Sequence, residues 1–259
     1  MGRSQFMFFD LQKASMLKRF SAFLLDVILL CVLITGIALA VSAVTGFDGY
    51  LNTFESGYAK YEEEYGIDFD ITEEDYLKLS EAEKADFDAA RKAFSEDRDI
   101  LYAYNMMINL ALVILSVSVL LSYVILEFAV PLFFGNGQTI GKKIFAIGVM
   151  QQNHVRITPV QLFVRSVLGK CTIETMVPML IILMIFIGSL GLVGTGILIL
   201  FLVLEIALMI GTKTNSTVHD ILSASVAIDL SSQMIFDNEK ELLDYKKRRA
   251  EEAAAESKY

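Results

Sequence analysis

The chain has 259 residues, of which 54 % are hydrophobic and 20 % charged, and its formal net charge is −9. The charge is segregated: residues 47–103 contain 17 acids and 6 bases, so this stretch alone carries −11 and the rest of the chain +2. An acidic surface is unsuited to nucleic acid, and the two histidines, His154 and His219, predict no metal-ligand cluster. No nucleic-acid partner, metal or cofactor is therefore expected.

The N-terminal part predicts a membrane anchor. Residues 1–17 predict an interfacial segment on the inner membrane surface. Residues 18–46 predict the first transmembrane helix, because residues 20–44 hold one charge, Asp26, and can cross a ~30 Å hydrocarbon core. Arg19 lies seven residues before Asp26, on the same helix face, and Asp26 is expected to face protein or water. A cleavable signal peptide is the alternative, which the length of the run and its internal acid disfavour.

Residues 47–103 predict an extracellular acidic insert that forms a small helical hairpin between the first two membrane helices. Two helix starts are indicated by capping patterns, Thr72 with Asp75 and Ser80 with Glu83. The many acids of the insert are expected to form a solvated face.

Residues 104–134 predict the second transmembrane helix, in which Glu127 is the one charge. Polar residues recur on the helical face of Glu127, and this stripe is expected to face the bundle interior and line a pathway. The stripe comprises Asn105, Asn109, Ser116 and Tyr123.

Residues 135–170 predict a cytoplasmic loop followed by an amphipathic helix that begins at Pro159. The glycine-rich stretch before Lys142 lacks the spacing of a phosphate-binding loop, so no nucleotide site is expected. Residues 144–150 predict either a short strand or an interfacial segment. Five bases of this region are expected near anionic lipid headgroups: Lys142, Lys143, Arg156, Arg165 and Lys170.

The C-terminal half predicts two further membrane helices, over residues 171–188 and over residues 191–212, the latter containing Glu205. Residues 213–236 predict a cytoplasmic segment with His219–Asp220, and residues 237–259 a charged tail, solvated or disordered. The fold class is thus an all-α polytopic membrane protein with four transmembrane helices. The distribution of bases predicts that both termini are cytoplasmic and that the acidic insert lies outside.

Three acids from three predicted helices lie at one depth. Asp26 and Glu205 lie six residues, and Glu127 about seven, inside the inner ends of their helices, or about 9–10 Å. Crowded carboxylates in a low dielectric cannot all stay ionised, so at least one is expected to hold a proton, with Arg19 and Lys142 or Lys170 neutralising the others. The hypothesis is a layer that binds a proton and a cation. The alternative is a polar cluster that only sets helix register.

These residues resemble the RDD family of bacterial membrane proteins. The resemblance is carried by Arg19, Asp26, Glu127, the loop 137–143, Arg156, Arg165 and His219–Asp220. The arginine and two aspartates that name the family match Arg19, Asp26 and Asp220. The resemblance implies a multi-pass protein of the bacterial plasma membrane. Some members are described as sodium/proton antiporters, which agrees with the ion or proton binding expected of Asp26, Glu127 and Glu205, and the match adds Arg19 and Asp220 to these candidate residues.

Two functions remain open at this point. The first is a proton-coupled transporter of a monovalent cation such as sodium. The second is a non-transporting interaction or regulatory protein that binds a partner or anionic lipid. An enzyme is not expected, because no nucleophile, base and orienting group lie at suggestive spacing. The chain shows no inverted repeat, so a transporter built from it is expected to be a homo-oligomer in the lipid bilayer.

Overall fold

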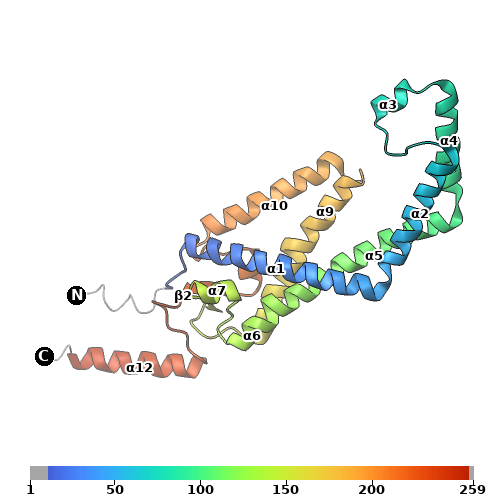
Figure 1. Cartoon of the computed structure of the whole chain (residues 1–259). Helices are drawn as coiled ribbons and strands as arrows, with labels where there is room; N and C mark the ends of the chain where they lie inside the picture. The colour runs from blue at the N-terminus through green and yellow to red at the C-terminus, as the bar shows by residue number, and fades with distance from the viewer. Residues whose placement is uncertain (1–10, 257–259) are drawn as a thin grey trace. The chain divides into compact units, whose positions relative to one another are not determined.

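The computed structural model describes residues 11–256 (Figure 1). The chain divides into two units. One unit contains the chain up to Leu33 and from Val119 onward, and the other is Ile34–Ser118. Among the described residues, four helices are long and apolar enough to cross a membrane: Met16–Thr45, Arg98–Phe134, Pro159–Phe186 and Gly191–Gly211. The predicted all-α, four-span membrane fold is confirmed.

Two of the four spans are single α-helices and two are composite. The single helices are α1 (Met16–Thr45) and α10 (Gly191–Gly211). The second span consists of α5 (Arg98–Tyr123), the π-helix η1 (Val124–Ala129) and α6 (Val130–Phe134). The third consists of α8 (Pro159–Phe163), the π-helix η2 (Val164–Met176) and α9 (Val177–Phe186). This corrects the predicted third span, because the amphipathic helix from Pro159 continues into it without a break.

A proline accounts for the wide turns of both composite spans. Proline lacks an N–H, and its ring clashes with the carbonyl four residues earlier in an α-helix. Pro131 lies four residues after Glu127, and Pro178 four residues after Glu174. In both spans the chain responds with hydrogen bonds five residues apart, which is the π pattern. The charged residues of these spans within the larger unit all lie in the two π segments.

A small antiparallel sheet joins distant parts of the larger unit. Strand β1 (Ile147–Gln151) pairs with β2 (Ser225–Asp229), with Val149 opposite Ala227. On the other edge of β2, Ala14 N–H donates to the Ala227 carbonyl at 3.2 Å, so the chain just before α1 is held to the sheet. Of the two alternatives for residues 144–150, the strand is therefore found. The predicted interfacial segment lies mostly outside the described residues.

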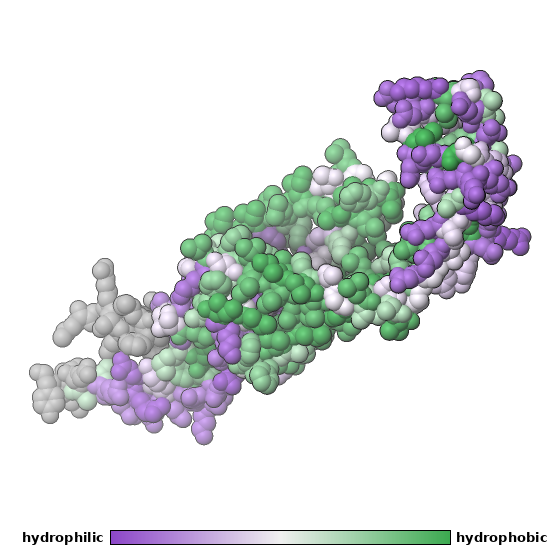
Figure 2. All heavy atoms as spheres, viewed as in Figure 1, coloured by the Kyte–Doolittle hydropathy of each residue, from purple (hydrophilic) through white to green (hydrophobic). Residues whose placement is uncertain are grey.

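A short helix precedes each strand of this sheet: α7 (Ile140–Ile144) precedes β1, and α11 (Val218–Leu222) precedes β2. The C-terminal helix α12 (Glu239–Glu256) comes after β2 in the chain. Leu242 and Tyr245 of α12 pack against Val155 and Phe236, so the charged tail has an apolar anchor. Hydrophilic side chains otherwise cover α12 in Figure 2.

The smaller unit is built around aromatic rings. Its soluble helices are α2 (Phe47–Tyr65), α3 (Glu73–Lys78) and α4 (Glu81–Glu96). Phe94 contacts the rings of Phe54, Tyr58, Tyr61 and Phe69, with centroid distances of 5.5–5.9 Å. Both predicted helix caps are present, at Thr72 and Ser80. Hydrophilic side chains cover the surface of these helices, whereas apolar side chains cover the membrane helices (Figure 2).

The glycine-rich loop approaches α1 closely at Gly141. A methyl group on Gly141 would lie 2.8 Å from Oδ1 of Asp26 and would also overlap the Ala22 carbonyl oxygen. Because that oxygen belongs to the backbone, it cannot rotate away. The absence of a side chain at Gly141 therefore permits the contact between this loop and α1.

We expect Gly141→Ala to lower the stability of the protein by about 1–3 kcal/mol, because the added methyl overlaps a backbone carbonyl. Thermal unfolding of the purified protein in detergent measures the change. Gly36→Ala in α1 is the matched control, since no described atom outside the adjacent residues and backbone of its own helix lies within 4 Å of the methyl it adds. Equal unfolding midpoints for the two variants would contradict the close approach.

Candidate functional site

A cavity of about 740 Å³ lies within the larger unit, bordered by α1, η2, α10 and α11. Apolar side chains of α1 and α10 form one part of its lining. Ionisable side chains from five segments form the other part: Arg19, Asp26, Lys142, Arg165, Lys170, Glu174, Glu205 and His219. Three groups of contacts, together with the hydrogen bonds of Asp26, hold these residues in place.

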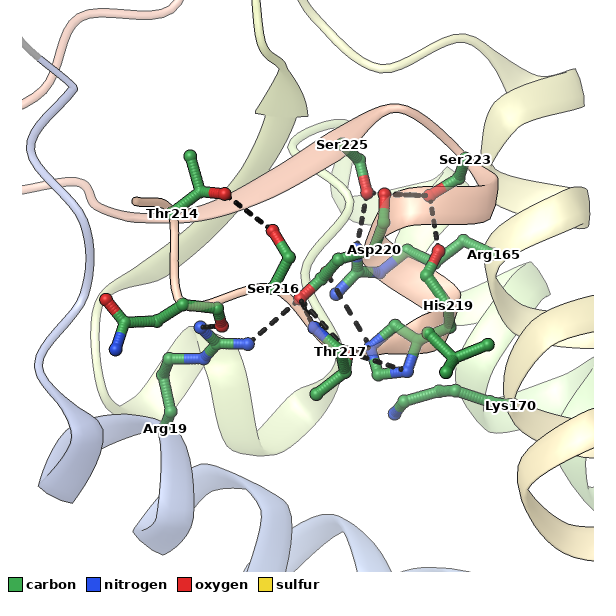
Figure 3. A network of polar contacts seen from close by, with 12 residues as sticks. Arg19, Arg165, Lys170, Thr214, Ser216, Thr217, His219, Asp220, Ser223 and Ser225 are labelled. Carbon is green, nitrogen blue, oxygen red and sulfur yellow. Dashed lines mark hydrogen bonds and ion pairs between the residues drawn. The ribbon is translucent and has the colours of Figure 1, made fainter. Parts of the chain in front are cut away.

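The first group is centred on Asp220 of α11, which is 1 % exposed (Figure 3). Arg165 of η2 forms an ion pair with its Oδ1, and Arg19 Nη2 of α1 lies 3.0 Å from its Oδ2. The Thr217 N–H also donates to Oδ2 at 3.1 Å. Burial by itself raises the pKa of Asp220, but the charges of Arg165 and Arg19 hold it well below its ordinary value. Asp220 is thus a stably ionised centre that joins α1, η2 and α11.

The second group is centred on Glu127 of η1. Lys170 Nζ lies 2.6 Å from Glu127 Oε1, and Lys142 Nζ lies 3.9 Å from Oε2. Burial and the neighbouring Lys170 lower the pKa of Lys142 to about 8, although the Glu127 and Asp26 carboxylates oppose the shift. Glu127 therefore has two cationic neighbours, and Lys142 is the more easily neutralised of them.

Asp26 has hydrogen-bond donors from the glycine-rich loop. Its Oδ2 accepts from Thr139 Oγ1 at 2.5 Å, and its Oδ1 accepts from the Gly141 N–H at 2.8 Å. The Thr139 hydroxyl also accepts from the Lys142 N–H and so begins α7. Asp26 thereby fastens the loop to α1 and helps to direct Lys142 toward Glu127.

The third group contains two neighbouring carboxyl groups. His219 donates its backbone N–H to Glu174 Oε1 at 2.9 Å, and its ring Nδ1 lies 2.8 Å from the same carboxyl. Burial lowers the pKa of His219 below its ordinary value, which favours the neutral ring. The Glu205 carboxyl lies within hydrogen-bonding reach of Glu174. Its Oε2 accepts a long bond of 3.4 Å from Val218, and its Oε1 is buried with no hydrogen-bond partner among residues 11–256.

The charges around the cavity do not cancel within the described part of the chain. The acids are Asp26, Glu127, Glu174, Glu205 and Asp220, and the bases are Arg19, Lys142, Arg165 and Lys170. Since His219 is neutral, five acids face four bases and one negative charge is in excess. Glu205 has the weakest set of partners and is the natural place for that excess.

The predicted acid layer is only partly reproduced. Asp26 and Glu205 line the cavity, and Glu127 pairs with Lys142 and Lys170, which also line it. The three acids do not crowd one another, because the two lysines lie beside Glu127. The two carboxyls that meet are Glu205 and Glu174. Glu174 was not predicted as a site residue, although its spacing to Pro178 repeats that of Glu127 to Pro131. Arg19 pairs with Asp220 and not with Asp26.

The predicted headgroup contacts are wrong for three bases. The side chains of Arg165, Lys142 and Lys170 are 4 %, 12 % and 15 % exposed and are paired inside the unit, because buried carboxylates lie opposite them. Lys143 remains at the surface, with Nζ 3.7 Å from the centre of the Phe134 ring. Arg156 pairs with Asp237 at 2.8 Å and is also exposed, so lipid binding by these two bases stays a prediction.

The predicted polar stripe of the second span is not its buried face. Asn105 and Asn109 are exposed and donate to carbonyls of their own helix, and Ser116 is exposed as well. Tyr123 is half-buried, and its hydroxyl lies 2.7 Å from that of Thr175.

Besides Glu127, the buried polar side chains described in this span are Ser118 and Ser122. The π turn explains the difference, because its hydrogen bonds join residues five apart and its wider turns shift the helix face that precedes Glu127 from Tyr123 toward Ser122 and Ser118. The sequence prediction assumed the α-helical period throughout.

Comparison with known proteins identifies one family. The model of the RDD family matches residues 13–224, which include Arg19, Asp26, Asp220 and all nine charged residues around the cavity. No curated protein and no solved structure matches the chain.

We expect Asp220→Asn to lower the stability of the protein by about 3–5 kcal/mol, because two guanidinium groups lose their buried carboxylate. Asp229→Asn is the control: its ion pair with Lys18 is far more exposed, and its loss should cost about 0–1 kcal/mol. Thermal unfolding in detergent measures both. Similar losses for the two variants would show that Asp220 is not the centre of the site.

The pKa of Lys142 makes stability depend on pH. Between about pH 8 and its ordinary pKa of 10.5, the unfolded chain binds a proton at this lysine that the folded chain does not bind, so stability rises with pH in this window. We expect Lys142→Met to remove this contribution and to be relatively more stable than the wild type below pH 8. Unfolding midpoints of both proteins across pH 6.5–10.5 provide the measurement, and parallel curves would contradict the assignment.

Proposed function

The chain belongs to the RDD family of membrane proteins, and from this premise we propose that it exchanges protons for a monovalent cation such as sodium across a bacterial plasma membrane. The observation that supports the proposal is the buried Oε1 of Glu205, which has no hydrogen-bond partner among the described residues and lies at a cavity whose acids outnumber its bases by one. Glu174 supplies a second carboxyl next to it.

The energetic argument starts from the cost of an isolated charge. An uncompensated carboxylate within a membrane protein is expensive and must be neutralised by a proton or by a bound cation. One excess charge needs one neutralising ion, so a proton and a monovalent cation exclude each other at Glu205. Mutually exclusive occupancy of one carboxyl is the minimum requirement for exchange.

The remaining charges have a supporting role in this proposal. Asp220 with its two arginines, and Glu127 with its two lysines, are already neutralised by protein groups. They hold α1, η1, η2 and α11 around the cavity and leave the Glu174–Glu205 pair to bind the transported ions. Asp26 positions the loop and contributes to the negative charge of the cavity.

The proposal includes an orientation and an assembly. In this proposal both termini and the small sheet lie in the cytoplasm and the acidic insert, residues 47–103, lies outside, in keeping with the distribution of bases along the chain. The protein acts as a carrier and not as an enzyme. It functions as a homo-oligomer in the lipid bilayer, because four spans are few to enclose a pathway.

Sodium-dependent proton movement in liposomes tests the exchange. With purified protein and a trapped pH indicator, an imposed sodium gradient is expected to drive proton flux. Glu205→Gln is expected to reduce this flux by about tenfold or more, because the excess charge is removed. Glu63→Gln, an exposed acid of the smaller unit, is the control and should leave the flux unchanged. Absence of sodium-driven flux in folded wild-type protein, or full flux in Glu205→Gln, would refute the proposal.

A further inference from the structure

The cavity is much larger than an ion requires. Its volume is about 740 Å³, whereas one water molecule occupies about 30 Å³ of the liquid. Cavities of about 300–1,000 Å³ hold small organic molecules. A proton or a sodium ion would fill a small part of this volume, so the cavity has room for a larger ligand.

The side of the cavity that faces the membrane is apolar. Phe20 and Phe23 of α1 line it together with Leu202, Ile206 and Met209 of α10. Phe23 and Leu202 line the cavity and are still 55 % and 60 % exposed. The cavity is therefore open between these two apolar helices, each of which is long enough to cross a membrane. A ligand that enters from this side must carry an apolar body.

The polar end of the cavity selects the sign of the ligand. Its four bases are engaged by Asp220 and Glu127 or lie beside Asp26. An anionic headgroup would add to the existing excess of negative charge. Glu205 Oε1, in contrast, is buried without a partner among the described residues and can receive a cationic group. The neighbouring phenylalanine rings favour a cation over an anion as well.

We propose that this cavity binds an amphiphilic organic cation, with its charged group against Glu205 and Glu174 and its apolar body between α1 and α10. The inference rests on the proposed function in one respect: it uses the same carboxyl and extends the transported class from sodium to lipophilic cations. The ligand reaches the cavity sideways from the bilayer. It competes with the proton, since either one neutralises the single excess charge.

Two ions of nearly equal size and opposite charge provide the test: tetraphenylphosphonium and tetraphenylborate. Binding of each to the full chain in nanodiscs is measured by calorimetry, with empty nanodiscs subtracted. The phosphonium is expected to bind with one ion per chain and to bind more weakly as the pH is lowered. The borate is expected not to bind. Equal binding of both ions, or no binding of the phosphonium, would overturn the proposal.

Variants locate the bound ion. Glu205→Gln is expected to weaken phosphonium binding by about tenfold or more, because the neutral amide leaves no excess charge. Leu202→Ala is expected to weaken it by up to about tenfold, because the apolar body loses a contact. Leu200→Ala, two residues away on α10 and outside the cavity lining, is the matched control. Binding that responds equally to Leu202→Ala and Leu200→Ala would reflect partition into lipid and would also overturn the proposal.

The outcomes separate the two proposals. Sodium-driven proton flux without phosphonium binding would leave the exchange function intact and refute the amphiphilic ligand. Phosphonium binding that depends on Glu205, without any sodium-driven flux, would support the amphiphilic cation as the ligand and refute sodium exchange.

Discussion

The buried carboxylate of Asp220 is the interaction on which the larger unit depends. It holds Arg19 of the first span and Arg165 of the third span, and the guanidinium of Arg165 also donates to Ser225 at the start of β2. One acid thus connects two membrane helices, α11 and the sheet. Breaking such a buried group leaves charges without partners, which costs far more than losing a surface ion pair. The position of the cavity follows from this connection, because α1, η2 and α11 are three of its four borders.

Proline has a comparable effect along the helices. Pro131 and Pro178 each follow a membrane-embedded glutamate by four residues, and each converts the preceding turns to the π pattern. The wider turns shift which side chains face inward, and in this way Glu127, Arg165, Lys170 and Glu174 reach the site. The two irregular helical segments therefore coincide with the charged residues of these spans.

The distribution of charge then separates structure from activity. Most ionisable groups of the cavity have protein partners and hold helices together. The Glu174–Glu205 pair is different, since two carboxyl groups lie side by side and one buried oxygen has no partner within residues 11–256. In a low dielectric this arrangement favours an added positive charge. Both proposals, cation exchange and binding of an amphiphilic cation, derive from this imbalance. They differ in that only the second assigns a ligand to the apolar part of the cavity.

The sequence by itself was sufficient for the number of membrane spans, the acidic insert, its two helix caps and the family, because hydropathy, capping and motif spacing are local properties. It also identified Asp26, Glu127 and Glu205 as unusual, since charges within apolar helices are costly wherever they point. Only the tertiary structure decided the partners: Arg19 meets Asp220 across 201 residues, and Lys170 meets Glu127 across 43. It also decided that Arg165 is buried, that Glu174 belongs to the site, and that Ser118 and Ser122 replace the predicted stripe. Side-chain pairing between distant helices and the extra residue of a π turn both depend on how the helices pack, and no local period in the sequence encodes that packing.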